Sequence, residues 1–112
     1  MQELVTRLRL FAEERDWEQF HSPKNLAMAL SVEVAEIVEH FQWLTEEESR
    51  GLGEDKRAEL ADEIGDVMIY LVNLSDKLGV DPLRAATKKL EKNELKYPAG
   101  LVRGKSQKYT EY

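Results

Sequence analysis

The sequence predicts an all-α fold of the four-helix-bundle type. Apolar residues recur at the three- and four-residue spacing of amphipathic helices through most of the 112 residues. Start signals for helices stand at Ser22-Pro23 and at Asp81-Pro82, where a capping side chain precedes a proline at the first helical position. No stretch alternates apolar and polar residues as a half-buried strand would. We therefore expect one all-α domain covering residues 1–112.

Each predicted helix has its own boundary signals. The four long helices are predicted over residues 2–16, 23–43, 55–78 and 82–96. Gly79 suits the left-handed backbone conformation that commonly ends a helix. The string Thr45-Glu46-Glu47-Glu48 has the form of a capping box and predicts a short helical turn between the second and third long helices. No regular structure is predicted for the tail, residues 99–112.

Composition and charge exclude several classes of function. The net charge of −6 argues against a general nucleic-acid-binding surface, which needs clustered lysine and arginine. The absence of cysteine excludes disulfides and thiolate metal sites and is compatible with the cytoplasm, where we expect the protein. We see no signal peptide and no apolar run long enough to span a bilayer, so no membrane partner is expected.

Two pairs of carboxylates are set into the apolar helices. Glu33 and Glu36 lie in the second long helix, and Glu63 and Asp66 lie in the third. Residues three apart occupy one face of a helix, so each pair presents two acidic groups side by side. Carboxylates rarely enter a packed interior without a compensating cation. Four oxygen ligands from two helices therefore predict a site for a hard divalent cation such as Mg²⁺.

The position of these acids on the helices supports a metal site over ordinary surface acids. Glu33 lies at the edge of the apolar stripe of its helix, and Glu63 borders the stripe of Leu60, Ile64, Val67 and Leu71. Mg²⁺ commonly bridges protein carboxylates to the phosphates of a substrate. A phosphate ester or anhydride is therefore the natural ligand of this site.

Other chemistries fit the sequence less well. A di-iron bundle needs Glu-x-x-His on each of two helices, whereas this chain has one such string, Glu18 to His21, at a helix break. Neither histidine has an obvious serine partner for nucleophilic hydrolysis. The run at residues 67–72 is apolar almost all round its helix, which predicts burial in an oligomer interface.

Several segments together resemble the MazG-like nucleoside triphosphate pyrophosphohydrolases of the all-α NTP pyrophosphatase superfamily. The Glu-x-x-Glu and Glu-x-x-Asp pairs match the metal-binding motif of that family. Further segments resemble its dCTP pyrophosphatase branch, and they are Glu14-Arg15-Asp16-Trp17-Glu18-Gln19-Phe20-His21-Ser22-Pro23-Lys24-Asn25-Leu26, Phe41-Gln42-Trp43, Asp66-Val67-Met68-Ile69-Tyr70-Leu71, Lys96-Tyr97-Pro98 and Lys108-Tyr109-Thr110. The resemblance covers nearly the whole chain.

The resemblance implies an enzyme that hydrolyses a (deoxy)nucleoside triphosphate to the monophosphate and diphosphate. It implies that Glu33, Glu36, Glu63 and Asp66 are the catalytic residues and hold one or more Mg²⁺ ions. It also implies a helical bundle assembled as a homodimer or homotetramer, with active sites near subunit interfaces. The preferred substrate would be dCTP or a modified dCTP, in the service of nucleotide-pool sanitation.

The resemblance also suggests which residues bind the substrate. The triphosphate is expected to meet Lys89, Asn93, Arg103 and Lys105. The base or sugar is expected to meet Trp17, Phe20, His21, Asn25, Trp43 and Tyr70. His40 receives no role from the resemblance, and we expect it to make a local hydrogen bond. Alternatives that stay open are preference for oxidised purine dNTPs or dUTP, and a non-catalytic helical assembly module with a vestigial metal site.

Overall fold

The computed structural model describes residues 1–104, and within that range it contains helices and no strand. The elements are α1 (Gln2–Glu14), the 3₁₀ turn η1 (Glu18–Phe20), α2 (Pro23–Phe41), α3 (Glu46–Arg50), α4 (Glu54–Lys77), α5 (Pro82–Lys96) and α6 (Ala99–Val102). The all-α prediction is therefore confirmed, and all four predicted long helices are present.

The helix ends follow the capping chemistry of the sequence. The Ser22 hydroxyl accepts a hydrogen bond from the Asn25 backbone N–H at 3.1 Å and caps α2. The Asp81 carboxylate accepts from the first turn of α5 in the same way. Thr45 and Glu48 complete the predicted capping box, at 3.1 and 2.9 Å. Beyond α4, Gly79 takes a φ of +68°, which glycine adopts at little cost.

The tail prediction was wrong at its start. Residues 99–102 form the short helix α6, where no regular structure was predicted. Pro98 is the N-cap residue of α6, and its carbonyl oxygen accepts hydrogen bonds from the backbone N–H groups of Leu101 and Val102 at 2.9 and 3.1 Å. Lys105 and Lys108 lie outside the described residues.

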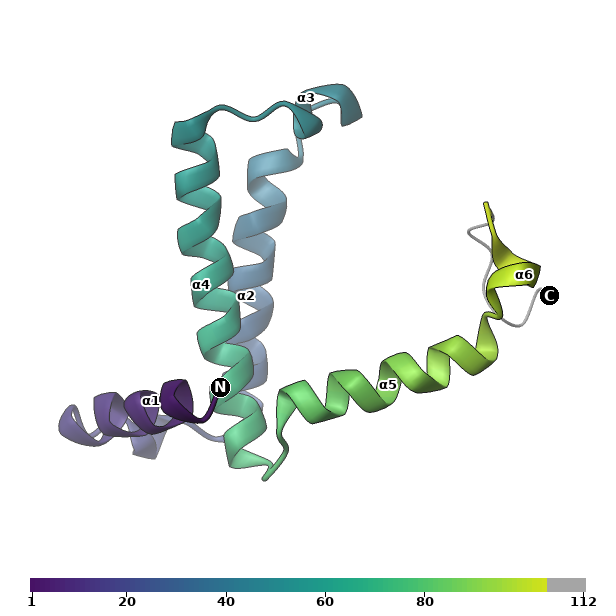
Figure 1. The fold of residues 1–112 in the computed structure, drawn as a ribbon. Coiled ribbons are helices and arrows are strands. Elements are labelled where there is room, and N and C mark those ends of the chain that lie inside the picture. The colour runs from purple at the N-terminus through teal and green to yellow at the C-terminus, as the bar shows by residue number, and fades with distance from the viewer. Residues whose placement is uncertain (105–112) are drawn as a thin grey trace. The chain divides into compact units, whose positions relative to one another are not determined.

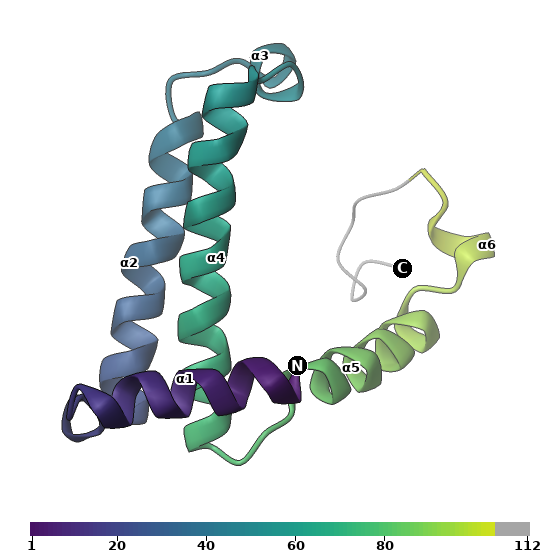
Figure 2. The same cartoon turned by 60° about the vertical axis from the view of Figure 1, so that its left-hand side comes forward.

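The chain divides into two compact units, residues 1–80 and the part from residue 81 onward. In the first unit, α2 and α4 lie side by side, and α1 crosses the end of this pair that holds the start of α2 and the end of α4 (Figures 1 and 2). Leu26 of α2 and Val72 of α4 are each 1% exposed. Full burial of such a side chain contributes about 1.5–3 kcal/mol. This seam fixes the two helices that carry the acidic pairs.

Fewer apolar residues of α4 are buried against α2 than the sequence pattern predicted. Ile64 and Leu71 were expected to face inward with Leu60, but they are 58% and 39% exposed, while Leu60 is buried. Two packed helices cover only one side of α4, so the remaining apolar residues stay uncovered within this chain. In the second unit, the described residues form α5 and α6. None of the described helices is both long and apolar enough to cross a membrane.

Candidate metal centre and adjoining pocket

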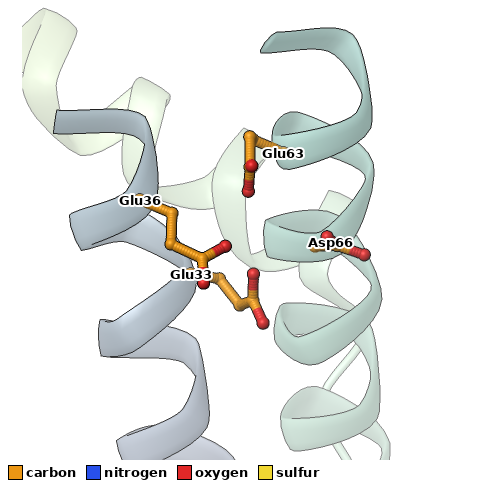
Figure 3. A group of neighbouring side chains, drawn as sticks. All are labelled: Glu33, Glu36, Glu63 and Asp66. Atoms are coloured by element: carbon orange, nitrogen blue, oxygen red, sulfur yellow. The ribbon is translucent and has the colours of Figure 1, made fainter. Parts of the chain in front are cut away.

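The four predicted metal ligands lie together between α2 and α4. One oxygen from each of Glu33, Glu36, Glu63 and Asp66 lies within 4.8 Å of the others. Figure 3 shows Glu33 and Glu36 reaching from α2 toward α4, which carries Glu63 and Asp66. The first three are half-buried and Asp66 is exposed. The pairs meet because their helices pack along the Leu26–Val72 seam and each pair borders that seam.

The electrostatics of this cluster are unfavourable for four bare carboxylates. Burial, followed by the nearby Glu36, Asp66 and Glu63, raises the pKa of Glu33 from 4.5 to about 7. The pKa of Glu63 is also raised, mainly by its interaction with the Glu36 carboxyl group and then by burial. Desolvation and like charge both disfavour the ionised form of a carboxyl group. Glu33 and Glu63 therefore bind a proton more readily than an ordinary surface carboxyl group does.

The donor set fits a hard divalent cation. Glu33 Oε2 and Glu63 Oε2 are buried and have no hydrogen-bond partner within the described residues. Buried polar atoms are nearly always satisfied in folded proteins, so two orphaned oxygens in one cluster indicate a missing electropositive partner. All four ligands offer oxygen and none offers sulfur or nitrogen, which suits Mg²⁺. The residues present therefore fit the cation that the sequence predicted.

His40 lies at one edge of the cluster, and its hydrogen bond is made to another helix rather than locally as was predicted. Its Nδ1 is 3.0 Å from Nζ of Lys56 on α4. Its Nε2 is 3.8 Å from Glu63 Oε1, and the side chain is 17% exposed. The pairing of His40 with Lys56 could not be predicted from the sequence, because it depends on how α2 and α4 align.

A pocket adjoins the acidic cluster on its α1 side. Its volume is about 440 Å³, and Asp66 belongs both to its wall and to the cluster. The lining residues come from α1, the α1–α2 connection and α4, and they are Leu4, Arg7, Leu8, Phe11, Ala12, Trp17, His21, Asp66, Ile69, Tyr70 and Asn73. The volume falls in the range of small-ligand sites, which are typically apolar with a few polar groups.

Three of the predicted base-binding residues line this pocket, and three do not. Trp17, His21 and Tyr70 are wall residues. The remaining three are exposed and lie elsewhere, and they are Phe20, Asn25 and Trp43. Asn25 donates from its side chain to the Phe20 carbonyl at 3.2 Å, so it stabilises the turn before α2. A role for these three in substrate binding stays a prediction.

The wall of the pocket is built from aromatic and ionic contacts. The rings of Phe11 and Trp17 meet edge to face at 5.6 Å, and the Arg15 guanidinium lies 3.8 Å from the centroid of Phe11. Arg9 of α1 makes two hydrogen bonds to the Asp76 carboxylate of α4. The Arg9–Asp76 contact joins α1 to α4, the two helices that supply most of the pocket wall.

Two polar wall residues were missed from the sequence. Asn73 follows Asp66 and Tyr70 at spacings of seven and three residues, which puts all three on one face of α4. That spacing could have identified Asn73. Arg7 of α1 had no comparable signal, because its place depends on the crossing of α1 over α4.

The predicted triphosphate-binding residues belong to the second unit. Lys89 and Asn93 lie one turn apart on α5, and Arg103 follows α6. The nearby ammonium group of Lys96, followed by burial, lowers the pKa of Lys89. This indicates a local concentration of positive charge on α5. Lys105 lies outside the described residues, so it stays a prediction.

The sequence model of the MazG-like family matches residues 28–112. The chain belongs to the MazG-like family. This MazG-like chain is 50% identical over 103 residues to human dCTP pyrophosphatase 1 and 47% identical to the rat protein of that name. The matched region covers 90% of this chain and 61% of each relative, so the chain spans less than two thirds of their length.

A solved structure supports the same assignment of this MazG-like chain. The crystal structure of a pyrophosphatase from Archaeoglobus fulgidus matches with a TM-score of 0.83 and 45% sequence identity. The match covers 88% of this chain and 92% of the archaeal one. Identity at this level, over nearly the full length of both chains, agrees with the family assignment.

Proposed function

We propose that this chain is a Mg²⁺-dependent nucleoside triphosphate pyrophosphohydrolase that converts a (d)NTP and water to the (d)NMP and diphosphate. The observation that carries the proposal is the acidic cluster, with two buried oxygens that lack partners, opening directly beside a pocket of about 440 Å³. Relatives named dCTP pyrophosphatase and pyrophosphatase support this reaction class.

The reaction needs a water molecule to attack the α-phosphorus while the bond to the bridging oxygen of the β-phosphate breaks. Glu33, Glu36, Glu63 and Asp66 would hold Mg²⁺, which when bound neutralises phosphate charge and lowers the pKa of water. A carboxylate of the same cluster accepts the proton that the water loses. Asp66 belongs to both cluster and pocket, so a nucleotide seated in the pocket brings its α-phosphate to the acids.

The proposed substrate is dCTP or a modified dCTP, as the named relatives suggest. The pocket supports a nucleobase ligand because Trp17 and Tyr70 offer aromatic surfaces, while His21 and Asn73 offer polar groups to the edge of a base. Stacking of a base on an aromatic side chain contributes about 1–3 kcal/mol.

The phosphates beyond the reacting centre need cations. Lys89, Asn93, Arg103 and Lys105 are proposed to bind the diphosphate part of the substrate. The concentration of positive charge that lowers the pKa of Lys89 supports this role, because a bound polyanion would relieve it.

We further propose that the protein works as a homodimer or homotetramer in the cytoplasm. Large apolar side chains are exposed along both long helices of the first unit, and they are Met28, Val32, Val34, Val38, Ile64, Met68 and Leu71. Soluble monomers rarely expose so many on two packed helices, which supports burial against another copy. Size-exclusion chromatography with light scattering would measure the assembly.

A panel of nucleotides tests the activity and the base preference together. Diphosphate release is measured for dCTP, 5-methyl-dCTP, dUTP, an oxidised purine dNTP and CTP, each with Mg²⁺ and with a chelator. We expect release that requires Mg²⁺ and is fastest with a cytosine nucleotide. Faster release from dUTP or the oxidised purine would reassign the substrate, and no release from any nucleotide would favour a non-catalytic helical module.

A further inference from the structure

His40 is a half-buried polar residue that the proposed reaction does not use. It lies on α2 four residues after Glu36, so it borders the acidic cluster on the same helix. Its ring is held between two groups of α4, with Nδ1 3.0 Å from Lys56 Nζ and Nε2 3.8 Å from Glu63 Oε1. A polar ring in this position needs an explanation beyond packing.

The contact with Lys56 fixes the tautomer of the ring. An ammonium group carries only donors, so Nδ1 must accept this hydrogen bond and cannot carry a proton. In the neutral ring the proton is then on Nε2, which is the nitrogen that faces Glu63. The Glu59 carboxylate lies 3.6 Å from Lys56 Nζ and steadies the ammonium group. Lys56 therefore directs an N–H dipole at one oxygen of a predicted metal ligand.

The two oxygens of Glu63 have different surroundings. Oε1 faces His40 at 3.8 Å, which is too long for a hydrogen bond but close enough for a favourable charge–dipole contact. Oε2 is buried and has no hydrogen-bond partner within the described residues. One oxygen of the carboxylate thus lies near a ring nitrogen of His40, while the other is buried without a partner.

We propose that His40 is a positioning residue that orients the Glu63 carboxylate for metal binding, with Lys56 holding the imidazole in the required tautomer. This inference rests on the proposed metal site. Groups that orient the ligands of a metal typically change its affinity about 10- to 100-fold when removed. His40 is neither one of the four residues that would hold the cation nor a wall residue of the pocket. It limits rotation of the Glu63 carboxylate, so less conformational freedom is lost when the cation binds.

Metal affinity without nucleotide is the primary test. Titration calorimetry with Mg²⁺, and with Mn²⁺ as a second probe, compares the wild type with His40→Leu, His40→Gln and the control Glu39→Gln. We expect about 10-fold weaker binding for His40→Leu. His40→Gln should restore most of the affinity because its amide retains an N–H donor. Glu39 is exposed and lies one residue away, so Glu39→Gln should bind as the wild type does.

Thermal unfolding of the metal-free proteins separates positioning from a purely structural role. His40→Leu should unfold near the wild-type temperature, because leucine fills a similar volume. A structural role would instead lower the unfolding temperature and leave the affinity of the folded protein unchanged.

The tautomer provides a second, independent readout. Nitrogen-15 NMR of the His40 ring in the wild type, at a pH where the ring is neutral, should show the proton on Nε2. A proton on Nδ1 would overturn the inference, as would equal affinity in His40→Leu and the wild type. A wild-type protein that binds neither cation would overturn the proposed function, and with it this inference. If His40→Leu does not fold, the NMR measurement and the affinity of His40→Gln decide.

Discussion

Helix α4 carries acidic residues in two contrasting situations. Near its end, Asp76 accepts two hydrogen bonds from Arg9, which lowers the pKa of Asp76 below 3.8. In its middle, Glu63 faces other carboxyl groups, and its pKa is raised. Both residues stand on the same helix at similar exposure, with 24% of each side chain accessible. The difference lies in their partners.

Asp76 has a cationic partner within the chain, whereas the four acids of the cluster face mainly one another. Arg9 supplies Asp76 with a cation from within the chain, and the resulting pair holds α1 against α4. Among the described residues, no arginine or lysine forms an ion pair with the four carboxylates of the cluster, and the nearest basic group is His40, whose Nε2 is 3.8 Å from Glu63 Oε1. Repulsion among carboxylates that lack a cationic partner lowers the stability of the metal-free protein, and a bound cation would reduce that repulsion.

The largest expected effect is the loss of turnover in Glu63→Gln. The amide keeps the shape of the side chain but removes the charge that would bind the cation. Diphosphate release at saturating dCTP and Mg²⁺ should fall by more than about 100-fold, since loss of a ligand should exceed the loss of an outer group. Circular dichroism should show an unchanged helical fold. Turnover at the wild-type rate would reject Glu63 as a metal ligand.

The next largest effect concerns the pocket beside the cluster. Trp17→Ala removes an aromatic wall that packs edge to face on Phe11. If the base stacks here, KM for dCTP should rise about 10-fold, in keeping with about 1–3 kcal/mol per stacked base. Affinity for Mg²⁺ alone should not change, because Trp17 is not part of the cluster. Leu10→Ala is the control, since Leu10 is an exposed residue of α1 that does not line the pocket. An equal rise in KM for both variants would contradict the assignment.

A smaller effect is expected for Glu33→Gln, which should change how the free energy of unfolding depends on pH. Its pKa is raised from 4.5 to about 7, so between these values the folded state binds more protons than the unfolded state. The free energy of unfolding of the metal-free protein should therefore fall as the pH rises from about 4.5 to about 7. Glu33→Gln resembles the protonated form and should lose this contribution, becoming more stable than the wild type above that range.

Mg²⁺ should reverse the order of these two proteins. Bound cation at 100 times its Kd adds about 2.7 kcal/mol to the wild type, while the variant lacks one ligand and gains less. Protons compete with the cation below about pH 7, so the gain should shrink on acidification. Urea unfolding across this pH range, with and without Mg²⁺, measures both effects. Parallel pH profiles for wild type and variant would show that Glu33 is an ordinary surface acid.

Local chemistry explains which parts of this molecule could be predicted from the sequence. Ser22, Thr45 and Asp81 act on backbone groups within the same turn, so their effect does not depend on the rest of the fold. The acidic pairs were also predictable, because three-residue spacing places each pair on one face before any packing occurs.

Features that depend on packing between distant helices could not be predicted in this way. The pocket exists because α1 crosses α4, and a helical period contains no information on a crossing angle. Arg7 and the contact of His40 with Lys56 belong to this class. The exposure of Ile64 has the same origin, because the period identifies an apolar face but not the element that covers it.

The smallest expected effect is that of Asp76→Asn, and it tests the other half of the comparison. The Arg9 side chain is 57% exposed, and ion pairs that open to solvent contribute little to stability. The variant should unfold at most a few degrees below the wild type at neutral pH, with unchanged Mg²⁺ affinity.

The pH dependence of stability gives a second readout for Asp76→Asn. Because the pKa of Asp76 is lowered from 3.8, the contribution of Asp76 to the free energy of unfolding is present above that pH and is lost as the pH falls through the folded-state value. The wild type and the variant should therefore converge in acid. This slope is opposite in sign to that of Glu33. If Asp76→Asn weakened Mg²⁺ binding as much as Glu63→Gln does, the distinction between an acid paired with Arg9 and an acid that binds Mg²⁺ would be wrong.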